Sequence, residues 1–149
     1  MQISEILSPD RIQFDSSATS KKAALETLSN LIANDSPELT QFEVFDSLIN
    51  RERLGSTGLG HGVAIPHGRI NHENKTLGAF IRVQTPVDYD AIDKQPVDIL
   101  FALLVPQEST DEHLQILSQL AEKFSNEEFL EKLRSEQSID AVYKLLAEQ

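Results

Sequence analysis

Residues 97–105 read VDILFALLV and form the most continuously apolar run in this chain of 149 residues. The run is far shorter than the roughly 20 apolar residues that cross a bilayer. It has the length of a β-strand, and an apolar run without alternation is typical of a strand that is buried on both faces. Such a strand needs helices on both sides of its sheet, so this stretch predicts a layered α/β fold.

Three segments before this run also read as strands. They lie near residues 11–14, at the short apolar run 63–65 and at the run LGAFIRV of residues 77–83. Amphipathic helical spacing separates them, with apolar residues on one face of 21–34 and of a segment from 42 to about 54. Strands that alternate with helices predict one α/β domain over residues 1–149, with a mixed, mostly parallel sheet and helices on both faces.

Start signals place four of the helices. Thr40 and Glu43 form a capping box, in which each side chain bonds the other residue's backbone N–H. Similar boxes are predicted at 109–112 and 125–128, and Ser138 is predicted to cap the last helix.

Charge and composition exclude several classes of function. The chain carries 24 acidic and 13 basic residues, a formal net charge of −11, which argues against nucleic acid and anionic membranes as partners. Its N-terminus has no export signal, and no segment is predicted to insert into a membrane. The absence of cysteine excludes disulfides and thiolate metal sites. These features predict a cytoplasmic protein.

Residues 55–69, GSTGLGHGVAIPHGR, hold five of the six glycines and two of the four histidines. Segment 51–75 carries four basic and two acidic side chains, so it is a positive island that suits an anionic ligand. We expect a buried strand that ends in a tight turn and presents His67. Pro66 fixes φ before this histidine, and Gly68 after it permits close approach of the backbone to a ligand.

Familiar phosphate and nucleophile motifs do not fit this stretch. No Gly-Lys-Ser/Thr follows the glycines, so it is not a Walker A loop, and Val63 stands where the dinucleotide fingerprint needs its third glycine. Ser56 lacks the spacing of a nucleophile elbow. His61, His67 and His72 show no spacing of a known metal motif, so we predict no metal site.

The remaining combination is His67, His113, Arg51 and the glycine-rich loop, with Gly55, Ser56, Thr57, Gly58 and Gly68 as the predicted phosphate-binding residues. A neutral imidazole is an available nucleophile near neutral pH. Phosphoryl transfer depends mainly on positioning and on stabilising charge on three oxygens, which backbone N–H groups, a guanidinium and a second imidazole supply. This chemistry needs no cofactor of its own.

These residues resemble the IIA phosphoryl-carrier domain of the phosphoenolpyruvate-dependent phosphotransferase system, fructose/mannitol type. The resemblance rests on three blocks, which are RERLGSTG at 51–58, GVAIPHG at 62–68 and His113 with Leu114 and Leu117. It implies that His67 is phosphorylated at its tele nitrogen and that His113 and Arg51 steady the phosphoryl oxygens. It also implies a mixed five-stranded sheet and an HPr-like phosphocarrier protein as the donor.

The stretch DAIDKQPVDILFALLVP at 90–106 is similar to the nitrogen-regulatory branch, IIA-Ntr. That branch implies regulatory protein targets such as potassium-transport proteins or sensor kinases. The alternatives are a sugar-specific IIA component that passes phosphate to a IIB component, and a metal-dependent hydrolase. His61 departs from the many relatives with asparagine there, and it is a second candidate to tune the site.

Overall fold

The computed structural model of the chain describes residues 2–71, 75–108 and 112–148. Its helices are α1 (Ile3–Ile6), α2 (Lys21–Asn34), α3 (Gln41–Glu52), α4 (Glu112–Phe124), α5 (Glu127–Ser135) and α6 (Ile139–Ala147), with a 3-10 turn η1 (Pro9–Arg11). Its strands are β1 (Ile12–Ser16), β2 (Gly58–Gly60), β3 (Val63–Ala64), β4 (His67–Ile70), β5 (Leu77–Val87) and β6 (Val97–Pro106).

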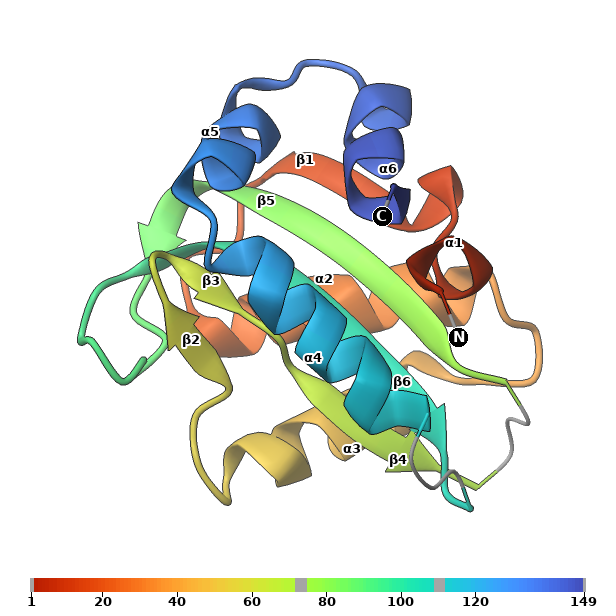
Figure 1. Cartoon of the computed structure of the whole chain (residues 1–149). Coiled ribbons are helices and arrows are strands. Elements are labelled where there is room, and N and C mark those ends of the chain that lie inside the picture. Colours follow the sequence, from red (N-terminus) through yellow and green to blue (C-terminus); the bar gives the residue numbers. More distant parts are fainter. Residues whose placement is uncertain (1, 72–74, 109–111, 149) are drawn as a thin grey trace.

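Strand β6 lies in the middle of the sheet, with antiparallel β5 on one side and parallel β3 and β4 on the other (Figure 1). β1 pairs with β5 and β2 pairs with β3 at the two edges. Three of the five described pairings are parallel, which confirms the mixed, mostly parallel sheet. All the apolar residues of the 97–105 run are buried, as predicted for a central strand.

Strands β3 and β4 lie end to end along the same side of β6. Val63 pairs with Ile99 and His67 pairs with Leu103, so the same register is kept on both sides of Pro66. The described sheet therefore has six strands but is five positions wide. The prediction of a tight turn at residues 66–68 is wrong. Pro66 lacks an N–H and interrupts the ladder, but its carbonyl accepts from the Leu103 N–H at 2.9 Å, and the chain continues as β4.

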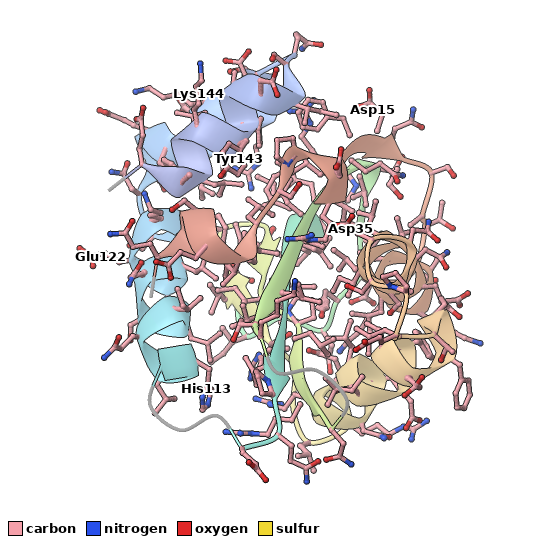
Figure 2. All side chains as sticks on the ribbon, turned by 90° about the vertical axis from the view of Figure 1, so that its right-hand side faces the viewer. Asp15, Asp35, His113, Glu122, Tyr143 and Lys144 are labelled. Carbon is pink, nitrogen blue, oxygen red and sulfur yellow. The ribbon has the colours of Figure 1, made fainter. Side chains whose placement is uncertain are left out.

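Helices cover both faces of the sheet, as the central strand requires. Figure 2 shows the sheet nearly edge-on, with α4 on one side and α2 and α3 on the other. On β6, Leu100, Ala102 and Leu104 pack with α2 and α3, while Ile99, Phe101, Leu103 and Val105 pack with α1, α4, α5 and α6. This alternation follows from the two-residue period of a strand. No helix in the described part of the chain is long and apolar enough to span a membrane.

Two predicted helix starts are confirmed, and a third lies one residue later than predicted. Thr40 and Glu43 form the predicted capping box of α3, and Ser138 caps α6. The cap of α5 is Asn126 rather than Ser125, because Ser125 still bonds back to Ala121 and Glu122 at the end of α4. The box predicted at 109–112 falls mostly on residues outside the described ranges.

Candidate functional site

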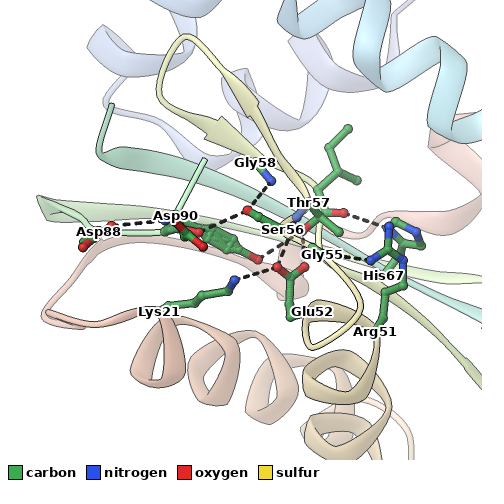
Figure 3. Close-up of polar contacts among 12 residues, drawn as sticks. Lys21, Arg51, Glu52, Gly55, Ser56, Thr57, Gly58, His67, Asp88 and Asp90 are labelled. Atoms are coloured by element: carbon green, nitrogen blue, oxygen red, sulfur yellow. Dashed lines mark hydrogen bonds and ion pairs between the residues drawn. The ribbon is translucent and has the colours of Figure 1, made fainter. Parts of the chain in front are cut away.

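His67 is the first residue of β4 and its side chain is half-buried. Its Nδ1 lies 2.9 Å from the carbonyl oxygen of Ile65 (Figure 3). A carbonyl only accepts hydrogen bonds, so Nδ1 is the protonated nitrogen of this bond. In the neutral ring, the lone pair available for reaction is therefore on Nε2.

The surroundings keep this ring neutral. Burial lowers the pKa of His67 from its ordinary value of 6.5, because the charged imidazolium loses hydration. The positive charge of Arg51 lowers the pKa further, while the Ile65 carbonyl and the Glu52 carboxylate act in the opposite direction. The net effect is a nucleophilic nitrogen that is unprotonated at neutral pH.

Two cavities meet at His67. The main cavity, of about 660 Å³, is lined among others by Phe42, Arg51, His67, Gly68, Arg69 and His113. The loop cavity, of about 630 Å³, is lined among others by Arg51, Ser56, Thr57, Gly58, His67 and Leu114. The structure thus brings His67, His113 and Arg51 to one cavity from three elements, which are β4, the first turn of α4 and the last turn of α3.

Successive residues of α3 hold the loop that follows this helix. Arg51 donates from Nη1 to the carbonyl oxygen of Gly55 at 2.9 Å. The carboxylate of Glu52 accepts from both the N–H and the hydroxyl of Thr57, and the ammonium of Lys21 pairs with it at 2.9 Å (Figure 3). Because the Glu52 side chain is only 2% exposed, these bonds offset the cost of burying its charge.

The loop donors are largely used within the protein. Besides Thr57, the N–H of Gly58 bonds the hydroxyl of Ser56 at 3.1 Å, and the N–H of Gly55 bonds the carbonyl of Glu52 at 3.1 Å. Ser56 in turn donates to the Tyr89 carbonyl at 3.1 Å. Ser56, Thr57 and Gly58 line the loop cavity beside His67, but in this arrangement their bonds mainly fix the loop.

Gly68 lines the main cavity, and its backbone is pressed against α3. A Cβ at this position would lie 2.8 Å from the carbonyl oxygen of Ser47 and closer still to its hydroxyl oxygen. The glycine therefore lets β4 pack directly on the helix that carries Arg51. Gly68 was predicted to permit close approach of the backbone to a ligand, and in the structure the neighbour that comes close is Ser47 of helix α3.

Two contributing residues were missed from the sequence, Arg69 and Glu52. Arg69 extends from β4 into the main cavity wall, where Nη2 lies 3.1 Å from Nε2 of His113 and Nη1 donates to the carbonyl of Gln107 at 2.9 Å. If residues 67–70 are read as an extended strand, Arg69 falls on the same face as His67. This was the signal in the sequence that could have found it. Nothing in the sequence marked Glu52 as buried.

The other histidines lie apart from this site. His61 has a positive φ of 59° in the turn between β2 and β3, and its described contacts are backbone bonds to Asp93 and Arg134. It is in the lining of neither cavity. His72 is outside the described residues. Among residues 2–71, 75–108 and 112–148, no group of three His, Asp or Glu side chains is placed to hold a metal ion.

Exposed apolar side chains surround the opening. Leu54 is 84% exposed, Phe42 is 72% exposed and Leu114 is 56% exposed, and all three line the main cavity. We call these three residues the apolar rim. Exposed apolar groups that gather around a charged cavity are typical of a surface that contacts another protein.

Comparisons with known proteins agree with this geometry. Residues 5–149 match the family model described as phosphoenolpyruvate-dependent sugar phosphotransferase system, EIIA 2. A nitrogen regulatory protein of Pseudomonas aeruginosa is 39% identical over 99% of this chain and 96% of its own length. The crystal structure of nitrogen regulatory protein IIA-Ntr from Neisseria meningitidis is similar with a TM-score of 0.92 and 46% identity, covering 97% of this chain and 98% of that one. A fructose-specific EIIA component of Haloferax volcanii is 34% identical over 98% of this chain and 95% of its own length.

Proposed function

Because the chain belongs to the EIIA type-2 family of the phosphoenolpyruvate-dependent sugar phosphotransferase system, we propose that it accepts a phosphoryl group on Nε2 of His67. The donor is an HPr-like phosphocarrier protein, and the exchange takes place in the cytoplasm. The observation that supports this proposal is the bond from Nδ1 of His67 to Ile65, since it leaves Nε2 as the nucleophile.

In the transfer, the Nε2 lone pair attacks the phosphorus of the donor's phosphohistidine. The new bond joins Nε2 to phosphorus, and the bond between phosphorus and the donor nitrogen breaks with its electron pair on that nitrogen. Arg51 and His113 line the same cavity and stabilise the charge on the three phosphoryl oxygens. Because the nucleophile starts neutral, the acceptor needs no general base to activate it.

A protein donor fits the surroundings of His67 better than a small molecule does. The apolar rim of Phe42, Leu54 and Leu114 supplies contact area around the cavity that His67 lines. Contact of this kind positions the two histidines for in-line transfer.

The second part of the proposal is regulation. The similar proteins from P. aeruginosa and N. meningitidis are named nitrogen regulatory proteins. Phosphorylation adds about two negative charges in the middle of the apolar rim, which changes the surface that a partner meets. We propose that protein targets, such as potassium-transport proteins or sensor kinases, distinguish the phosphorylated from the free form.

One observation favours a second function. The fructose-specific relative is 34% identical over nearly the whole chain, so transfer onward to a sugar-specific IIB component is the alternative output. The acceptor chemistry at His67 is the same in both cases. The two outputs differ only in what receives or senses the phosphoryl group.

The test of the acceptor incubates the protein with a phosphorylated HPr-like donor and follows the phosphoprotein. A base-stable, acid-labile phosphate is expected on the wild type and on His61→Ala, the control histidine that lies outside both cavities. His67→Ala is expected to carry none. Phosphate that persists on His67→Ala contradicts the assignment.

The two outputs are separated with the phosphorylated protein. Addition of a purified IIB component removes the phosphate if the protein serves sugar uptake. In the regulatory role, the phosphate stays in place and the affinity for a target protein differs between the two forms. Equal affinity for both forms contradicts regulation.

A further inference from the structure

The side chain of Arg69 connects β4 with the start of α4. Its Nη1 donates to the Gln107 carbonyl at 2.9 Å, directly after β6, and its Nη2 lies 3.1 Å from Nε2 of His113. The two bonds hold the guanidinium plane between the end of β6 and the first turn of α4. The fork geometry of arginine makes two directed bonds of this kind possible at once.

The bond to His113 determines which ring nitrogen carries the proton. A guanidinium has only donors and stays charged, so it donates to Nε2 and Nε2 must be the nitrogen with the lone pair. A doubly protonated ring has no lone pair to offer, so the His113 ring in this arrangement is neutral and protonated at Nδ1. The assignment follows from the chemistry of arginine.

Nδ1 of His113 is the ring's remaining polar atom. It is buried, and it has no hydrogen-bond partner among the residues that the structure describes. A buried donor without a partner is unfavourable, so such an atom needs an explanation, and a catalytic role or a bound ion is one of the recognised explanations. His113 lines the main cavity with His67 and Arg51.

We propose that Arg69 is a positioning residue that holds His113 as a neutral ring with its proton on Nδ1, so that this N–H is the donor offered to the phosphoryl group on His67. This inference rests on the proposed function for the identity of the anion. The tautomer of His113 in the unphosphorylated protein is independent of that function. Arg69 acts through His113, while His113 contacts the phosphoryl oxygens.

The test combines nitrogen-15 NMR of the His113 ring, at a pH where the ring is neutral, with the rate of phosphorylation by the HPr-like donor. In the wild type, we expect the pyrrole-type signal on Nδ1 and the pyridine-type signal on Nε2. Arg69→Met removes both donors, so the ring is no longer fixed and the Nδ1-protonated form loses its dominance. We expect phosphorylation to slow about tenfold, the effect of losing one hydrogen bond to a charged group in the transition state.

Two variants control for charge and folding. Arg53→Met removes the same charge from the end of α3, where Arg53 is exposed and its guanidinium bonds the Asn50 side chain. It is expected to change neither the His113 signals nor the rate. Arg69→Lys keeps a cation that only donates, so it is expected to retain the Nδ1 proton on His113 and to recover part of the rate.

A pyrrole-type signal on Nε2 of wild-type His113 overturns the inference. So does an Arg69→Met protein whose ring signals are unchanged, or one that is phosphorylated as fast as Arg53→Met. A wild-type protein that is not phosphorylated at all contradicts the proposed function instead, and the NMR signals still decide the tautomer.

Discussion

The two ring nitrogens of His67 differ in protonation because only Nδ1 is bonded to a backbone carbonyl. Ile65 occupies Nδ1, and the pair of cavities leaves Nε2 facing space that a phosphoryl group can enter. The same imidazole on a flexible loop would exchange its proton between both nitrogens. The strand geometry that fixes residues 65 and 67 thus leaves Nε2 as the nitrogen that carries the lone pair, which is the atom proposed to react.

The lowered pKa of His67 predicts how stability depends on pH. The unfolded chain takes up the His67 proton near pH 6.5, and the folded chain takes it up only at a lower pH. Between these two values the unfolded state binds more protons, so the free energy of unfolding falls as the pH falls and is unaffected above about 6.5. The neutral variant His67→Gln lacks this contribution.

Urea denaturation of the wild type and of His67→Gln across this range measures the effect. The stability of the wild type relative to the variant is expected to decrease below about pH 6.5 and to level off below the folded pKa. Parallel curves for the two proteins contradict the lowered pKa.

At this scale, residue type and local context were enough to find His67, Arg51 and His113 as candidates. Arg69 was missed because its partner His113 lies 44 positions away in the sequence. Glu52 was missed for a related reason, since a glutamate at the end of an amphipathic helix normally faces solvent. Its burial depends on Lys21 of the neighbouring helix α2, which sequence spacing does not reveal.

At the scale of elements, the contact of α3 with β4 sets the geometry of the site. Helix α3 contributes Arg51 and strand β4 contributes His67, and they approach closely at Ser47 and Gly68. The hydroxyl of Ser47 also donates to the carbonyl of Arg69 at 2.7 Å. Any side chain at position 68 would therefore separate the two elements that hold the nucleophile and its arginine.

Gly68→Ala is expected to reduce stability by about 1–3 kcal/mol, the usual cost of adding atoms to a tightly packed contact. It should also slow phosphorylation, because α3 must shift and take Arg51 with it. Denaturant unfolding and the phosphorylation rate measure the two effects.

A second substitution, Ser47→Ala, is not expected to rescue Gly68→Ala, since the backbone oxygen and carbon of residue 47 remain 2.8 Å and 2.9 Å from the new Cβ. A Gly68→Ala protein with wild-type stability and rate would show that the two elements are not in the contact described.

The long elements were predictable, and so were the short strands β1 and β3, whereas β2 and β4 were not. The periodic apolar patterns of α2 and α3 and the continuous apolar run of β6 identify these elements without tertiary information. Strand β2, with the sequence GLG, has no side-chain pattern, and it forms because β3 provides an edge to pair with. Strand β4 was mistaken for a turn because Pro and Gly flank His67, although β6 offers paired backbone groups there.

At the scale of the whole molecule, the acidic protein gathers positive and apolar groups at one opening. The net charge is −11, while Arg51, Arg69, His67 and His113 line the main cavity together with the apolar rim. The α/β fold itself was predictable from the central strand. The rim was not, because Phe42 and Leu54, at the two ends of α3, meet Leu114 of α4 only when both helices pack on the sheet.

The apolar rim predicts a difference between protein and small-molecule donors. Leu54→Asp is expected to lower kcat/KM for phosphorylation by the HPr-like protein about tenfold, since it removes an apolar contact at the interface. Phosphorylation by a small donor such as phosphoramidate should be unaffected. The matched control is Ile92→Asp, because Ile92 is 85% exposed and lies outside both cavities. Equal losses with both kinds of donor would place Leu54 in the chemistry rather than in docking.

The chain is paired with the central strand β6 in one register on both sides of Pro66, through β3 and β4. This pairing fixes the Cα of His67 in the sheet. An acceptor anchored in this way cannot advance toward an approaching phosphorus atom, and the described loop beside it is equally well tethered. The donor protein must then bring the phosphorus to a nitrogen that does not move. In the proposed exchange, the rate would then be set by the arrival and departure of the partner protein.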